Sequence, residues 1–285
     1  MTDPARAAEA TWSSFGLEAS AWRATPGVVL SVLANEIRKG LLILWAHPAP
    51  IVLAVVTMTF FYLGVQFIIG QGRMPSDLLP PTLVAFSAYI FLHIASLAMV
   101  ADLVEEMRTG TLGQTHLSPV SPSLLVLGRL GTASLQGVLV AALATVVPLG
   151  AVSITIPARG EALVPFALTL ANGLAFTLLF AGIALAEPFI GEIHHLFVGV
   201  IGTLNGMYLP VALFPDQLES VARLLPTTLG IEATLKVLFE GRSLGDLWID
   251  GSLPWLLAYT IGLTALGWLV FARNQRKAMR DGTLV

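Results

Sequence analysis

The chain contains no cysteine. This absence excludes disulfides, iron–sulfur clusters and structural zinc sites held by cysteine, a cysteine nucleophile and a lipid-anchored cysteine. Cysteine usage therefore says nothing about the compartment, which has to be inferred from topology.

Charge is also scarce. Only 12% of the 285 residues are charged, against about 25% in a typical soluble domain. Hydrophobic residues make up 55% of the chain, and its mean hydropathy is +0.81. A water-soluble fold of this length would have to cover its surface with about half the usual charges. The composition therefore predicts an integral membrane protein, and the net charge of −3 gives no basis for binding nucleic acid.

Enzyme motifs are missing as well. A P-loop needs a lysine directly after a glycine, and Lys39, Lys236 and Lys277 follow other residues. No H-E-x-x-H, G-x-S-x-G or G-x-G-x-x-G pattern occurs. We therefore expect no enzymatic activity, catalytic residue, cofactor or metal on this chain.

What the chain does have is long intervals without charge, and a helix needs about 20 apolar residues to cross a bilayer. Six intervals are long enough: residues 49–72, 78–101, 130–158, 162–186, 196–215 and 251–272. They predict an all-α integral membrane fold with six transmembrane helices in one permease domain, residues 26–273. The third helix should begin nearer Leu124 and end before Pro157.

The distribution of lysine and arginine predicts the orientation. With both termini in the cytoplasm, ten of the fifteen Lys and Arg residues lie inside. The other five, which would lie outside, are Arg73, Arg159, Arg223, Lys236 and Arg242. Excess basic charge marks the cytoplasmic side, so we expect a multi-pass protein of the cell (inner) membrane with cytoplasmic termini.

The terminal segments carry the charge that the intervals lack. Residues 1–25 contain five charges and no apolar stretch between them, so we expect a flexible cytoplasmic tail and no cleavable signal peptide. Residues 274–285 form a basic cytoplasmic tail.

Residues 26–47 have the pattern of a helix lying on the membrane. Pro26 suits a first helical turn, and one face of the helix is apolar while the other is polar. The apolar positions are Val29, Leu33, Ile37, Leu41 and Leu44, and the polar ones are Asn35, Arg38 and Lys39. The alternative is that this segment continues the first span.

Two connections differ from ordinary loops. In the cytoplasmic link 102–122, the second helix should extend to Arg108 and end at Gly110. A short crosswise helix over 111–117 should follow, and Ser121-Pro122 should begin the third span. In the outer segment 216–250, we expect two short helices that break near Pro226 and dip into the outer leaflet.

The polar residues near the spans have two readings each. Glu192, His194 and His195 could bind a metal, but adjacent helical residues diverge by about 100°, and a short cytoplasmic turn explains them as well. His93 lies within the second span, where a polar group is a functional candidate. Hydrogen bonding to a neighbouring helix would also explain it.

Two sets of residues resemble the permeases of the type-2 ABC exporter family. The first is Glu106-Met-Arg-Thr-Gly-Thr-Leu followed by Leu117-Ser-Pro-Val-Ser, which resembles that family's first cytoplasmic loop. The second is Pro210-Val-Ala-Leu-Phe-Pro215 with the later Leu224-Leu-Pro-Thr-Thr-Leu-Gly-Ile-Glu232, which resembles its outer region. The resemblance covers about residues 26–277. No large outer domain or fused nucleotide-binding domain accompanies it.

The resemblance implies a transmembrane subunit of an ATP-driven exporter. Its partners would be P-loop ATPase subunits, which would hold ATP and magnesium, a second permease copy or a paralogue, and membrane lipid. ATPase coupling would involve Glu105, Glu106, Arg108, Gly110, Thr111, Leu112, His116, Leu117 and Pro119. Candidates for a substrate route along spans one, two and five are Phe61, Tyr89, His93, Asn205 and Tyr208, and those for an outer gate are Pro210, Pro215, Pro226 and Glu232.

Three alternatives stay open at this point. An ion-coupled secondary transporter would need charged residues at mid-membrane, and none lies at the centre of a span. A membrane enzyme would need acid–base residues that converge on one side. A non-transporting scaffold would show no ATP-dependent flux. The substrate is open among hydrophobic drugs, lipids and lipid-linked glycans.

Overall fold

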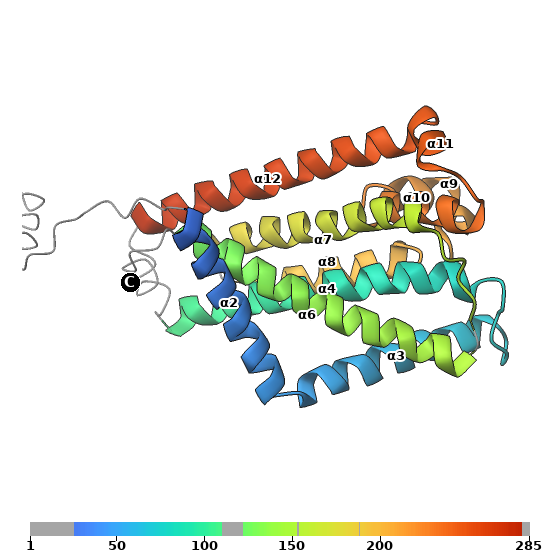
Figure 1. Ribbon diagram of the computed structural model, residues 1–285, viewed down its shortest axis with the longest axis horizontal. Coiled ribbons are helices and arrows are strands. Elements are labelled where there is room, and N and C mark those ends of the chain that lie inside the picture. The colour runs from blue at the N-terminus through green and yellow to red at the C-terminus, as the bar shows by residue number, and fades with distance from the viewer. Residues whose placement is uncertain (1–25, 110–121, 153, 188, 281–285) are drawn as a thin grey trace, which may run out of the picture.

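A computed structural model describes residues 26–109, 122–152, 154–187 and 189–280. Within these ranges every regular element is a helix, and the long helices form an elongated bundle with the short ones gathered at one end (Figure 1). The long elements are α2 (Pro26–Ala46), α3 (Ala49–Ile69), α4 (Leu79–Thr109), α6 (Pro122–Val152), α7 (Leu163–Ala184), α8 (Ile190–Leu204) and α12 (Ser252–Arg280).

Five of these helices, namely α3, α4, α6, α7 and α12, are long and apolar enough to cross a membrane. They coincide with five of the six predicted intervals, so those spans are confirmed in length and composition. The third begins at Pro122 and ends at Val152, before Pro157 as expected.

Helix α4, the second predicted span, forms the centre of the bundle. In its apolar window 78% of the residues are buried, against 22% for α3 and α12 and 28% for α6. It packs against α6, α7, α8 and α10. Its large side chains Phe86, Ile90 and Phe91 are almost completely enclosed. The lipid-facing surface is therefore supplied mainly by the helices that surround α4.

The fifth predicted span, residues 196–215, differs from the prediction. The helix there, α8, begins earlier, ends at Leu204 and has 15 residues. Its length of about 22 Å is less than the 30 Å or so of a hydrocarbon core. Asn205-Gly206 ends it, because Gly206 adopts a φ of +97°, which favours glycine. Pro210 then precedes a 3₁₀ turn at Val211–Leu213.

The side chain of Gln66 on α3 and that of Asn205 in the break itself satisfy backbone groups of this break. Gln66 Nε2 donates to the carbonyls of Met207 (3.3 Å) and Tyr208 (3.1 Å). Asn205 Nδ2 donates to the carbonyl of Ala85 (3.3 Å), and its Oδ1 accepts from the backbone N–H of Met207 (3.1 Å). Irregular backbone is tolerated within a membrane only where the protein itself supplies such partners.

The first described helix confirms the predicted helical segment but changes its packing. Leu33 and Ile37, expected on a membrane-facing stripe, lie against Gly128 and Gly131 of α6. The Thr132 hydroxyl of α6 donates to the α2 carbonyl of Glu36 (3.1 Å). The exposed large apolar side chains of α2 are Leu30 near its start and Leu41, Leu42, Ile43 and Trp45 at its C-terminal end.

The predicted outer segment contains three short helices instead of two: α9 (Asp216–Ala222), α10 (Thr228–Phe239) and α11 (Leu244–Ile249). The break at Pro226 between α9 and α10 is confirmed. The third helix begins with a capping box, in which Ser243 and Asp246 satisfy each other's backbone N–H groups. Hydrogen bonds from the backbone and hydroxyl of Ser243 hold the pKa of Asp246 below its usual value.

Candidate coupling and transport site

The end of the bundle at which α4 finishes carries the predicted coupling residues. As predicted, α4 continues past Arg108, to Thr109. The Arg129 Nη1 of α6 donates to Glu106 Oε2 over 2.6 Å, and both side chains are largely shielded from solvent. Glu105 and Arg108 are exposed on the same helix end. This ion pair joins the two helices from which the intervening loop leaves and returns.

The loop itself, residues 110–121, lies outside the described residues, and so does the predicted crosswise helix 111–117. The predicted coupling residues in it are Gly110, Thr111, Leu112, His116, Leu117 and Pro119.

Two cavities flank the end of α4. One of about 270 Å³ lies between α2, α4 and α6, and its polar wall residues are Glu36, Lys39, Asp102, Glu105, Glu106, Arg129, Thr132 and Gln136. The other, of about 340 Å³, lies between α4 and α8 and includes Asp102, Glu105, Arg108 and His195. The last turns of α4 therefore border open space on two sides, which leaves them accessible to a partner.

The histidine pair lies on α8 and not in the turn that was expected. His194 is 2% exposed, and its Nε2 is 2.8 Å from the hydroxyl of Ser96 on α4. Its ring also packs against Phe180, while His195 is exposed. Among the described residues no cluster of three metal-binding side chains occurs. His194 therefore acts as a packing contact that fastens α8 to α4.

The five candidate route residues do not line one common space. Phe61 projects outward at 60% exposure. Tyr89 and His93 lie together, with ring centroids 5.6 Å apart, and Tyr89 packs against Gly202. His93 Nδ1 is buried without a hydrogen-bond partner in the described part of the chain.

The remaining two candidates belong to the break after α8. The side chain of Asn205 is occupied by backbone groups. Tyr208 is half-buried and gives its carbonyl to Gln66.

The opposite end of the bundle brings together residues that were predicted separately. Asn205, Pro210 and Glu232 share a cavity of about 210 Å³. Arg223 lies on its wall and pairs with Glu219 (2.7 Å) and Glu232 (3.3 Å), tying α9 to α10. Of the other gate candidates, Pro215 precedes α9, and Pro226 is buried between α9 and α10.

A sequence model of the family described as "ABC-2 family transporter protein" matches residues 65–269, well over half of the chain. The chain belongs to the ABC-2 transporter family. No curated protein matches it. Membership and the apolar helices together make this ABC-2 protein a multi-pass membrane permease of an ABC transporter, a kind of protein that typically works with ATPase partners.

Two residues of this ABC-2 permease were missed from the sequence. Gln66 is the polar residue in the first apolar interval whose side chain supports the break after α8, and its position among apolar neighbours was a usable signal. Arg129 was counted only as a basic residue for orientation. Its pairing with Glu106 needed the packing of α4 on α6, which no local pattern predicts.

Proposed function

We propose that this chain is the membrane subunit of an ATP-driven exporter that moves a hydrophobic or amphipathic substrate outward. The substrate would be a drug, a lipid or a lipid-linked glycan. ATP and magnesium would be held by separate P-loop ATPase subunits, which would bind at the α4 end of the bundle. A second permease copy or paralogue would complete the transporter, with both termini of this chain on the cytoplasmic side.

The observation that carries this proposal is the ion pair between Glu106 and Arg129. It joins α4 and α6, the helices that precede and follow loop 110–121. The short N–H···O distance of 2.6 Å is typical of a strong charge-assisted hydrogen bond. A force applied to the loop by an ATPase would therefore reach α4 and α6 as one unit instead of bending either helix end.

The position of α4 supports the transmission of this movement from the coupling end to the opposite end of the bundle. This helix is the most buried of the candidate spans and contacts α6, α7, α8 and α10. Its Ser96–His194 contact reaches α8, and its Ala85 carbonyl holds the break after α8 through Asn205. A rigid displacement of α4 would therefore be passed to the break and to the cavity beside α10.

Charge reversal tests the proposal. The permease would be co-expressed with its cognate P-loop ATPase, reconstituted in vesicles, and assayed for ATP-dependent substrate flux. Glu106→Arg or Arg129→Glu alone should lower flux at least fivefold, because two like charges would then face each other between α4 and α6. The double exchange restores opposite charges and should recover much of the flux.

Lys39→Glu is the matched control, because Lys39 lines the same cavity but takes part only in a weak ion pair. Its side chain is 62% exposed, and its Nζ lies as far as 3.9 Å from Glu36 Oε2. Exposed pairs of this kind contribute about 0.2–1 kcal/mol, so its flux should stay near the wild-type value. Wild-type flux that does not depend on ATP, or on any ATPase bound to this chain, would refute the proposed function.

A further inference from the structure

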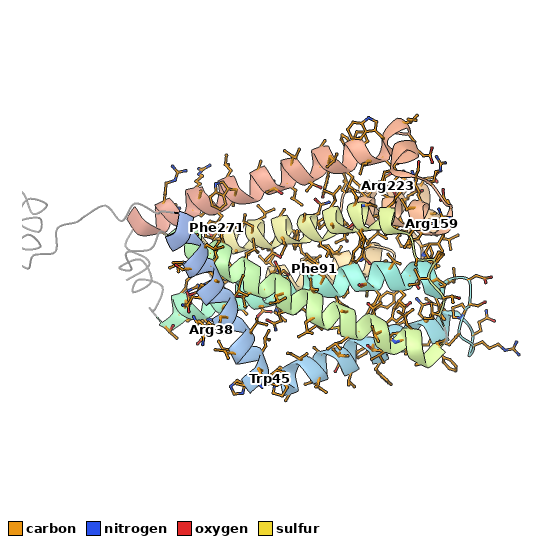
Figure 2. The ribbon with its side chains drawn as sticks, in the orientation of Figure 1. Arg38, Trp45, Phe91, Arg159, Arg223 and Phe271 are labelled. Carbon is orange, nitrogen blue, oxygen red and sulfur yellow. The ribbon has the colours of Figure 1, made fainter. Side chains whose placement is uncertain are left out.

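The connection between α6 and α7 carries an arginine, Arg159, at the meeting point of two cavities of opposite character. Both cavities include Arg159 in their walls. Figure 2 labels it near the end of the bundle that holds the short helices, away from Arg38 on α2. No ion pair of Arg159 is found within the described residues. By contrast, Arg223 and Arg242, which also line cavities at this end, each pair with a carboxylate.

The first cavity is an apolar groove of about 290 Å³. Its walls come from α4, α6, α7 and α10, and include Val84, Ile156, Pro157, Phe166 and Leu238. The groove's edge on α7 is Leu163, which is 69% exposed and lies in the first turn of the candidate membrane span Gly160–Ala184. An apolar groove beside exposed apolar side chains at the start of a span faces hydrocarbon and suits an acyl chain.

The second cavity, of about 240 Å³, is formed by Gly160, Glu161, Gly241, Arg242 and Ser243 together with Arg159. Its other charges are already engaged. Glu161 Oε2 accepts the backbone N–H of Leu244 (2.8 Å), and Arg242 lies 3.7 Å from Glu240 and 3.8 Å from Asp250. Arg159 is therefore the basic residue of this cavity that makes no ion pair with a described carboxylate.

The guanidinium of Arg159 lies close to Gly241. A Cβ built on Gly241, whose φ is +74°, would lie 3.1 Å from Arg159 Nη2. The guanidinium thus packs over bare backbone at the end of α10, where it lies between the polar cavity and the apolar groove. A planar guanidinium binds phosphate oxygens in two parallel hydrogen bonds.

We infer that these two cavities form one binding site for an anionic phospholipid, with an acyl chain in the apolar groove and the phosphate on Arg159. The headgroup would occupy the polar cavity near Ser243. Arg242 already lies beside Glu240 and Asp250, whereas Arg159 makes no ion pair with a described carboxylate, so this unpaired guanidinium favours a lipid with a net negative charge over a zwitterionic one. The site is separate from the coupling end and from the proposed substrate route.

Native mass spectrometry of the full-length protein in detergent tests this inference. Phosphatidylglycerol, phosphatidylcholine with the same chains, and soluble glycerol phosphate would be titrated in parallel. Arg159→Gln should weaken phosphatidylglycerol binding about fivefold, since one basic side chain near a membrane surface is worth about 1 kcal/mol. Phosphatidylcholine should bind weakly to both proteins, and glycerol phosphate should not displace the bound lipid.

Arg73→Gln is the matched control, because Arg73 is an exposed arginine of the α3–α4 connection that lines neither cavity. It should leave lipid affinity unchanged. Ala158→Trp, which fills the groove from an exposed wall position, should weaken lipid binding while leaving Arg159 intact. The unfolding temperature of each variant shows that it has folded.

Three results would overturn the inference. Equal losses for Arg159→Gln and Arg73→Gln would show diffuse surface charge instead of a site. Full lipid affinity in Ala158→Trp would remove the acyl chain from the groove. Displacement of the lipid by glycerol phosphate would leave only a phosphate site. None of these results bears on ATP-dependent flux, so this inference can fail without the proposed function failing.

Discussion

Replacing Gln66 by methionine should destabilise the break after α8. Gln66 is 0% exposed, and its amide donates to Thr82 Oγ1 (3.2 Å) and to the carbonyls of Met207 and Tyr208. Methionine keeps the length of the side chain but provides no donor, so two buried carbonyls lose a partner. An unsatisfied buried group costs about 1–3 kcal/mol, and interhelical hydrogen bonds in membranes average about 0.6 kcal/mol.

We therefore expect Gln66→Met to lose about 2 kcal/mol. For a chain of this size that lowers the unfolding temperature by about 4–8 °C. Thermal unfolding in one detergent, with hydrogen exchange of residues 205–210, measures both the loss and its location. Thr203→Val is the control, because the exposed Thr203 hydroxyl bonds only to Gly199 in its own helix. Unchanged stability and unchanged exchange in Gln66→Met would refute the reasoning.

Two further predictions concern packing and coupling. Gly182→Leu should lower the unfolding temperature by several degrees, because a Cβ at Gly182 would lie 2.6 Å from the Phe271 backbone nitrogen of α12; Gly262→Leu, with open space around it, should not. Gly110→Pro or Leu112→Ala should abolish ATP-dependent flux without preventing membrane insertion, as flux assays and membrane fractionation would show. Normal transport in the Gly110→Pro, Leu112→Ala double variant would contradict the role of the loop.

The parts of the fold that follow from local pattern could be predicted from the sequence. Charge-free intervals predict six spans because a charge inside the bilayer costs about 2.5–3.5 kcal/mol, and five of the six coincide with helices long and apolar enough to cross a membrane. Pro226 marks the break between α9 and α10, since proline interrupts helical hydrogen bonding. The third outer helix was missed, although Ser243 and Asp246 have the spacing of a capping box.

The remaining features depend on contacts between distant segments. The interval 196–215 is apolar enough for a span, but Asn205-Gly206 ends the helix where the Gln66 side chain can satisfy the free carbonyls. The Asn205 side chain donates there to the Ala85 carbonyl of α4 and accepts from the Met207 N–H. The apolar stripe of α2 could pack on a membrane surface or on another helix. It packs on α6 because Gly128 and Gly131 leave room there for Leu33 and Ile37. At the candidate site, Asn205, Pro210 and Glu232 meet around one cavity that no spacing along the chain would indicate.

The length of α4 has a mechanical consequence. Its 31 residues make a rod of about 46 Å, roughly 16 Å longer than the hydrocarbon core. Neighbouring helices pack around the middle of α4 and would act as the pivot of a tilt. A tilt of about 5° would therefore move the two ends by about 2 Å each, in opposite directions. A small push on one side of the bilayer would thus appear as an equal, reversed shift on the other, beside the break after α8.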